Sequence, residues 1–143
     1  MKIRFFCDGI SFHLKAKRAI TKLIKNVVAD EKKTIDSLCY VFVSDEIILE
    51  LNQKYLNHNY CTDIITFDYS CGNSISGEMY ISVDTVRENA KDYNVDFKTE
   101  MLRVILHGAL HLCGYKDDSE EEQQEMRKIE DKYLATFDKA IHS

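Results

Sequence analysis

Apolar residues along the chain recur at two spacings, one typical of strands and the other typical of helices. Four short runs rich in β-branched and aromatic residues predict strands: KIRFF at 2–6, SLCYVFV at 37–43, DIITFDY at 63–69 and GEMYIS at 77–82. The turn-forming residues SCGNS separate the last two runs, so we expect these two strands to pair with each other.

Apolar residues three and four positions apart predict helices between and after these strands. We expect them near 14–29, 45–55, 83–93, 98–113 and from Ser119 towards the C-terminus. Ser119 and Glu122 have the spacing of a capping box, and Gly114 lies where a glycine commonly ends a helix. The order β-α-β-α-β-β-α-α-α predicts one compact α+β domain over residues 1–143, with a small, mostly parallel four-stranded sheet and about five helices.

Composition narrows the functional classes without choosing one. No apolar run approaches the roughly 20 residues needed to cross a bilayer, and the N-terminal segment lacks the apolar stretch of a secretion signal. The five cysteines contain no CxxC and suggest no disulfide framework, so we expect a reducing, cytoplasmic location without membrane contact.

Charge is unevenly distributed over a chain whose net charge is −5. Residues 15–33 hold seven Lys and Arg against two acids, whereas residues 117–131 hold eight acids against two Lys and Arg. The overall sign argues against a protein that coats nucleic acid non-specifically. The basic first helix is either a solvated face or a contact for phosphates; its cations are Lys15, Lys17, Arg18, Lys22 and Lys25.

The stretch HGALHLCGYKDD (107–118) carries the most specific chemistry. His107 and His111 are four residues apart on a predicted helix, so their imidazoles share a face in the manner of paired zinc ligands. Gly114 allows the chain to turn back, and either Asp117 or Asp118 then supplies a third, carboxylate ligand. Most HxxxH pairs bind no metal, but the apolar helix, the glycine and the following carboxylate together favour a metal site.

Two neighbours of this motif restrict the chemistry. Cys113 lies six residues after His107, off the histidine face, and is interpreted as a small apolar residue. Gly108 stands where zinc proteases of the HExxH type carry their general base. A bound metal would therefore have to activate the water without that base, by lowering the pKa of the water. The small size of Gly108 also predicts room beside the site for an extended or bulky substrate.

Three segments resemble the YbeY family of rRNA-maturation endoribonucleases. HGALHLCGYKDD is similar to the family signature H-G-x-L-H-L-x-G-Y-D-H. LNQKYLNHNYCTDIITF (51–67) resembles L-N-x-x-Y-R, four residues, then P-T-D-V-L-S-F, and GEMYIS stands where the family has G-D-I-x-I-S. The resemblance spans about residues 40–135, in matching order.

The resemblance implies a compact α+β fold, one zinc ion and cleavage of single-stranded RNA. It also implies maturation of the 3′ end of 16S rRNA and ribosome quality control, with rRNA, ribosomal particles and ribosomal proteins as partners. By position the ligands fall on His107, His111 and Asp117, the last replacing a histidine with an oxygen ligand that zinc also accepts. The family arginine near the metal falls on Leu56, with Lys54 and His58 nearby in sequence.

The preferred hypothesis is therefore a zinc-dependent endoribonuclease, with two alternatives. A metalloprotease-like hydrolase is disfavoured because no glutamate follows the first histidine. A non-catalytic, metal-stabilised ribosome-assembly factor is favoured by Leu56 in place of the arginine. Asp63 and Glu78 match or replace acidic positions of the pattern, and neither is assigned a catalytic role.

Overall fold

The structure is a computed structural model that describes residues 2–56 and 62–142, with side chains up to Phe137. Its centre is a four-stranded sheet in the order β1-β2-β4-β3. β1 (Ile3–Asp8) runs parallel to β2 (Thr34–Val43), and β2 runs parallel to β4 (Ser74–Ser82). β3 (Ile64–Asp68) is antiparallel to β4, as their short connection predicted.

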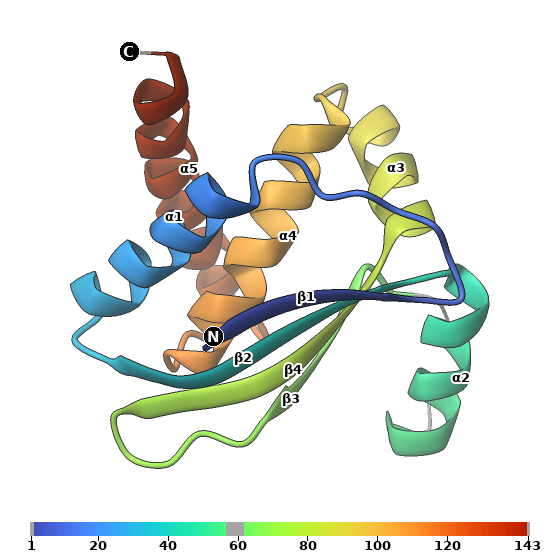
Figure 1. Cartoon of the computed structure of the whole chain (residues 1–143), viewed down its shortest axis with the longest axis horizontal. Coiled ribbons are helices and arrows are strands. Elements are labelled where there is room, and N and C mark those ends of the chain that lie inside the picture. The colour runs from blue at the N-terminus through green and yellow to red at the C-terminus, as the bar shows by residue number, and fades with distance from the viewer. Residues whose placement is uncertain (1, 57–61, 143) are drawn as a thin grey trace.

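The helices occupy both faces of this sheet, unequally (Figure 1). α1 (Lys17–Asp30), α3 (Val83–Asp92), α4 (Phe97–Leu112) and α5 (Glu120–His142) lie over one face. α2 (Asp45–Leu56) packs against the other. The predicted α+β class, the element order and the mostly parallel sheet are thus confirmed for the described part of the chain.

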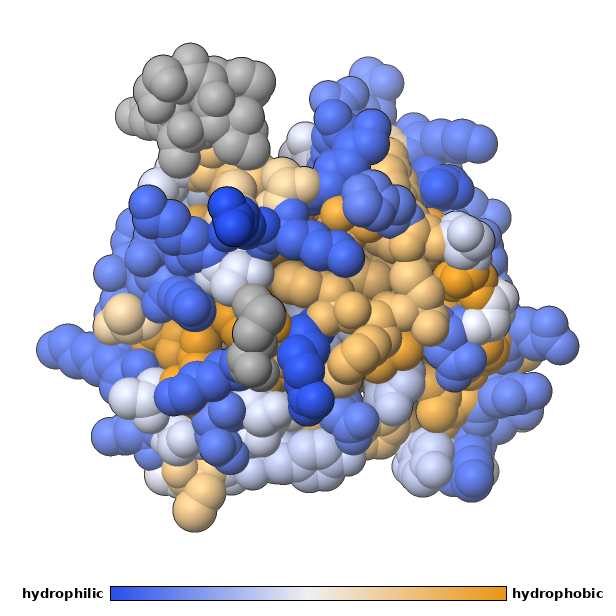
Figure 2. Space-filling view, viewed as in Figure 1, coloured by the Kyte–Doolittle hydropathy of each residue, from blue (hydrophilic) through white to orange (hydrophobic). Residues whose placement is uncertain are grey.

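The alternation of side chains along β2 explains this division. Tyr40 and Phe42 point into the main core, whereas Val41 and Val43 point into a smaller core under α2. A strand that is apolar on both sides can be covered on both, and burying each large side chain contributes roughly 1.5–3 kcal/mol. Figure 2 shows apolar side chains across the middle of one face of the molecule, with polar residues around most of its periphery.

α4 is the central helix of the main core, and ten of its sixteen residues are buried. The Tyr40 hydroxyl donates a hydrogen bond to the carbonyl of Ile105 at 3.0 Å, which ties α4 to β2. Gly108 faces the sheet: a Cβ there would lie 2.9 Å from Met79 Cγ and 3.0 Å from Ile64 Cδ1. The suggestion that this glycine makes room for substrate is therefore wrong, because the sheet uses the space.

Among the described residues, no helix has both the length and the apolar character that a bilayer crossing requires.

Candidate functional site

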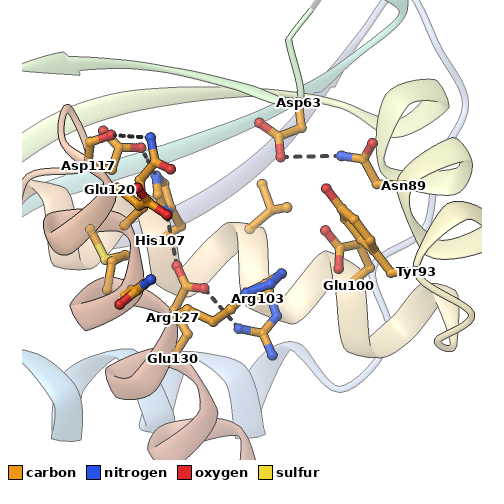
Figure 3. A pocket seen from close by; sticks show the side chains of 14 residues that line it. Asp63, Asn89, Tyr93, Glu100, Arg103, His107, Asp117, Glu120, Arg127 and Glu130 are labelled. Atoms are coloured by element: carbon orange, nitrogen blue, oxygen red, sulfur yellow. Dashed lines mark hydrogen bonds and ion pairs between the residues drawn. The ribbon is translucent and has the colours of Figure 1, made fainter.

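One face of α4 carries a row of polar side chains. Glu100, Arg103, His107 and His111 follow one another at intervals of three or four residues, so they lie along the same side of the helix. The first three line a pocket of about 520 Å³ whose other walls come from α3, α5 and the segment before β3 (Figure 3). The apolar side of α4 packs on the sheet and leaves these three side chains facing the pocket.

His107 lies between two carboxylates. Its Nδ1 is 2.8 Å from Oε2 of Glu130, and its Nε2 is 3.1 Å from Oδ2 of Asp117. Burial opposes protonation of the ring, but the hydrogen bond and charge of Glu130 outweigh it, aided by Asp117, so the pKa of His107 is raised. A cation is therefore favoured at this ring, whether it is a proton on Nε2 or a metal ion in its place.

Glu130 is a buried carboxylate, only 4% exposed, and it is fully engaged. One oxygen accepts from His107 and the other accepts from Nη1 of Arg103 at 2.9 Å. The same guanidinium also binds Asp131. A buried charge is tolerable when it is paired and hydrogen-bonded in this way, and the network fixes the orientation of the His107 ring.

The loop between α4 and α5 brings Asp117 back to His107. Gly114 has φ +110°, a left-handed conformation that ends the helix and reverses the chain, as predicted. Tyr115 then donates a hydrogen bond to Glu31 at 2.6 Å, and this bond raises the pKa of the phenol to about 12. Ser119 and Glu122 form the predicted capping box, each accepting from the other's backbone N–H, at 3.0 and 3.1 Å.

The predicted ligand set is brought together in part. His107 and Asp117 are in contact, while His111 lies one turn further along α4, and it stays a prediction as the third ligand. Within the described residues, no three His, Cys, Asp or Glu side chains converge closely enough to hold a metal ion. His107 and Asp117 nevertheless fit zinc, which accepts imidazole nitrogen and carboxylate oxygen. Glu130 lies on the other nitrogen of the ring, where a carboxylate commonly orients a histidine ligand towards a metal.

Two further carboxylates line the pocket, one before β3 and one on α4. Asp63 precedes β3 and lies 3.5 Å from the side-chain nitrogen of Asn89, while Glu100 is buried on α4. Burial raises the pKa of both groups; for Asp63 the charge of His107 opposes the rise, and for Glu100 that of Arg103 does. Each of these carboxylates is therefore a stronger base than an exposed one.

Several pocket residues were not found from the sequence, although a signal existed for some. Glu130 lies on the apolar stripe of α5, four residues after buried Met126 and three before buried Tyr133. A carboxylate on a buried stripe needs a polar partner, and this requirement alone could have identified Glu130 as a candidate site residue. The spacing of Glu100 and Arg103 before His107 was a second signal.

Other expectations concern residues away from this pocket. His58 and Cys61 lie outside the described residues. Leu56, at the end of α2, is 45% exposed. The basic residues of the first helix are not among those that line the pocket, so their contact with RNA stays a prediction for another surface.

The chain is similar to named endoribonucleases over nearly its whole length. The family model described as "Endoribonuclease YbeY" matches residues 8–138. "Endoribonuclease YbeY" of Bacteroides thetaiotaomicron is 44% identical, covering 94% of this chain and 98% of that protein. The protein of the same name from Porphyromonas gingivalis is 41% identical over 99% and 94%. The solution structure of TM1509 from Thermotoga maritima has a TM-score of 0.68 and 29% identity, covering 94% of this chain and 88% of that one.

The fold and these similarities define a nuclease of the hydrolase class. The chain belongs to the endoribonuclease YbeY family. The family prediction made from the three sequence segments is therefore confirmed, and so is the prediction of an endoribonuclease.

Proposed function

We propose that this chain is a zinc-dependent endoribonuclease that cleaves single-stranded RNA during rRNA maturation. Its substrate would be the 3′ end of 16S rRNA, and its partners would be ribosomal particles and their proteins. We also propose a role in ribosome quality control, because the resemblance to the YbeY family implies it. The four described cysteines are all free thiols, which supports action in the reducing cytoplasm.

One observation carries the metal dependence: the ring of His107 is held between Glu130 and Asp117. His107, His111 and Asp117 would hold one zinc ion. When bound, zinc would polarise a phosphoryl oxygen and make an attacking water or 2′-hydroxyl more acidic. Glu130 keeps the Nδ1 proton of His107, which leaves Nε2 as the nitrogen that faces Asp117.

The charge of the pocket also supports a bound cation. Five carboxylates line it, from Asp63, Glu100, Asp117, Glu120 and Glu130, against the two guanidinium groups of Arg103 and Arg127. An RNA phosphate entering this pocket would meet net negative charge. A divalent cation held by the proposed ligands would offset part of that repulsion.

Asp63 is the side chain best suited to move a proton in this reaction. It lies in the same pocket as His107, and burial raises its pKa, which makes the carboxylate a stronger base than an exposed one. We infer that Asp63 accepts the proton of the attacking hydroxyl or water. Arg103 stays bound to Glu130 and acts by holding that carboxylate behind His107.

The direct test measures metal content and RNA cleavage on the same preparation. The purified chain should contain about one zinc per molecule by elemental analysis and should cleave a single-stranded oligoribonucleotide. His111→Ala and Asp117→Ala should lose metal and cleavage together, whereas His13→Ala, at an exposed histidine, should lose neither. Cleavage that persists after the metal is lost would refute the proposal.

The same preparation addresses the two alternatives. Hydrolysis of an unstructured protein by the zinc-loaded chain would favour a protease, although Gly108 occupies the place of the protease glutamate and is packed on the sheet. Binding to ribosomal particles without any cleavage would favour an assembly factor. In that case Leu56→Arg, which restores the arginine of the family pattern, is expected to introduce cleavage.

A further inference from the structure

The pocket extends well beyond the pair of His107 and Asp117. A volume of about 520 Å³ lies within the range of small-molecule sites, and is much more than a metal ion with its water requires. In Figure 3, Asp117 and Glu120 lie at one side of the pocket, while Tyr93 and Asn89 lie at the other. The far side is therefore available to a part of the substrate that takes no part in bond cleavage.

Tyr93 gives this far side an aromatic surface. It is the C-cap residue of α3, where its N–H donates to the carbonyl of Asn89 at 2.9 Å. The backbone is therefore fixed, yet the residue remains 58% exposed. An exposed tyrosine fixed at a pocket wall is a surface on which a planar group can stack.

Arg127 provides the cation beside this ring. Its guanidinium carbon lies 5.7 Å from the centre of the Tyr93 ring, within the range of a cation–π contact. Arg103, the other arginine of the pocket, is already bound to Glu130 and Asp131. Among the described residues, no carboxylate lies within 4.0 Å of the guanidinium of Arg127, so it can still pair with an incoming anion.

We propose that Tyr93 and Arg127 form a nucleotide subsite in which an unpaired base stacks on the tyrosine ring and the arginine binds a neighbouring phosphate. The inference rests on the proposed function and adds the reason for single-strand specificity. A base inside a duplex has both faces covered by its neighbours, whereas a base in a single strand can leave the stack and lie on Tyr93. Since every base has a π face, the subsite selects for single strands and tolerates sequence.

Binding of a fluorescein-labelled, single-stranded RNA of about ten nucleotides tests the subsite without the metal, in the presence of EDTA. Tyr93→Ala should weaken binding roughly 5- to 150-fold, which corresponds to about 1–3 kcal/mol for one stacked base. Tyr93→Phe keeps the ring and should bind within about twofold of wild type. Tyr69→Ala is the matched control, because Tyr69 is 59% exposed but lies outside the pocket.

Arg127→Gln tests the phosphate contact separately. The slope of log affinity against log salt should fall by about one, as for the loss of a single phosphate contact. With zinc present, both Tyr93→Ala and Arg127→Gln should raise KM for the single strand much more than they lower kcat. Thermal unfolding of each variant checks that the fold is retained.

The outcomes separate this subsite from the proposed function. If wild type cleaves RNA but Tyr93→Ala binds as tightly as Tyr93→Phe, the subsite is wrong and the nuclease stands. Equal weakening by Tyr69→Ala, or equal binding of a duplex of the same sequence, also overturns it. If zinc-loaded wild type cleaves no RNA while Tyr93→Ala still weakens binding, the nuclease fails and the subsite remains.

Discussion

The two ends of the pocket are built differently. At one end His107, Glu130, Arg103 and Asp131 form a continuous chain of hydrogen bonds, and Glu130 is nearly inaccessible to solvent. At the other end Tyr93 is mostly exposed, and the Arg127 guanidinium lies over its ring without a carboxylate partner among the described residues. The first end is held in one geometry, as the proposed chemistry requires, and the second has the freedom that the proposed subsite needs for a flexible substrate.

The largest expected effect comes from removing the buried carboxylate at the rigid end. Glu130→Ala leaves His107 and Arg103 without their shared partner, so the free energy of unfolding should fall by about 3–5 kcal/mol. Zinc affinity should fall about 10- to 100-fold, as measured by competition with a chelator. Glu125→Ala, at an exposed position of the same helix, is the control. Unchanged zinc affinity in Glu130→Ala would show that this carboxylate does not support the proposed metal site.

Gly108→Ala is expected to disturb both ends together, because both depend on how closely α4 lies to the sheet. The added methyl group would lie 2.9 Å from Met79 Cγ, and Met79 is fully buried. Overpacking of this kind should lower the free energy of unfolding by about 1–3 kcal/mol, measured by urea denaturation. A variant as stable as wild type would mean that α4 can move away from the sheet without lowering the free energy of unfolding.

Glu100 also lines the pocket, and the effect of replacing it should depend on pH. Burial raises its pKa above the ordinary 4.5, so the folded chain binds its proton more tightly than the unfolded chain does. The stability that this group contributes is present below about pH 4.5 and is lost as pH rises through the raised value.

Glu100→Gln removes the buried charge and should therefore raise the melting temperature at pH 7, by the equivalent of about 1 kcal/mol or less. The difference from wild type should shrink to nothing below about pH 4.5, where the glutamate is protonated. Melting curves between pH 4 and pH 8 measure the stabilisation at pH 7 and its loss at low pH. A destabilised variant at pH 7 would mean that the charge of Arg103 outweighs burial.

The smallest change in stability is expected at the adaptable end. Arg127→Gln should alter the free energy of unfolding by no more than about 0.5 kcal/mol, since the side chain is exposed and forms no carboxylate pair among the described residues. Comparison with Glu130→Ala in the same denaturation series tests the contrast directly. A loss similar to that of Glu130→Ala would show that both ends are parts of one rigid structure.

The sequence predicted those features that local periodicity controls. The strands, the helices, the turn at Gly114 and the capping box at Ser119 each depend on residues close together in the chain, and all were confirmed. The contact between His107 and Asp117 could also be predicted, because a stretch of eleven residues contains both partners.

The rest of the pocket depends on packing between helices that are distant in sequence. Glu130 reaches His107 across 23 residues, and Tyr93 meets Arg127 only because α3 and α5 both flank α4. Gly108 is the opposite case, a residue assigned to the site from the sequence that belongs to the packing of the fold. Its small size was attributed to the site, whereas the structure places it against β3 and β4.

The segment that carries Asp117 is held at both of its ends. Tyr115 is anchored to Glu31 at one side and Ser119 to Glu122 at the other, which leaves three residues between the anchors. One inserted residue would add up to about 3.3–3.6 Å of chain, as much as the whole separation of the His107 nitrogen and the Asp117 oxygen. The site should therefore tolerate a different side chain at position 117 better than an insertion or deletion between Tyr115 and Ser119.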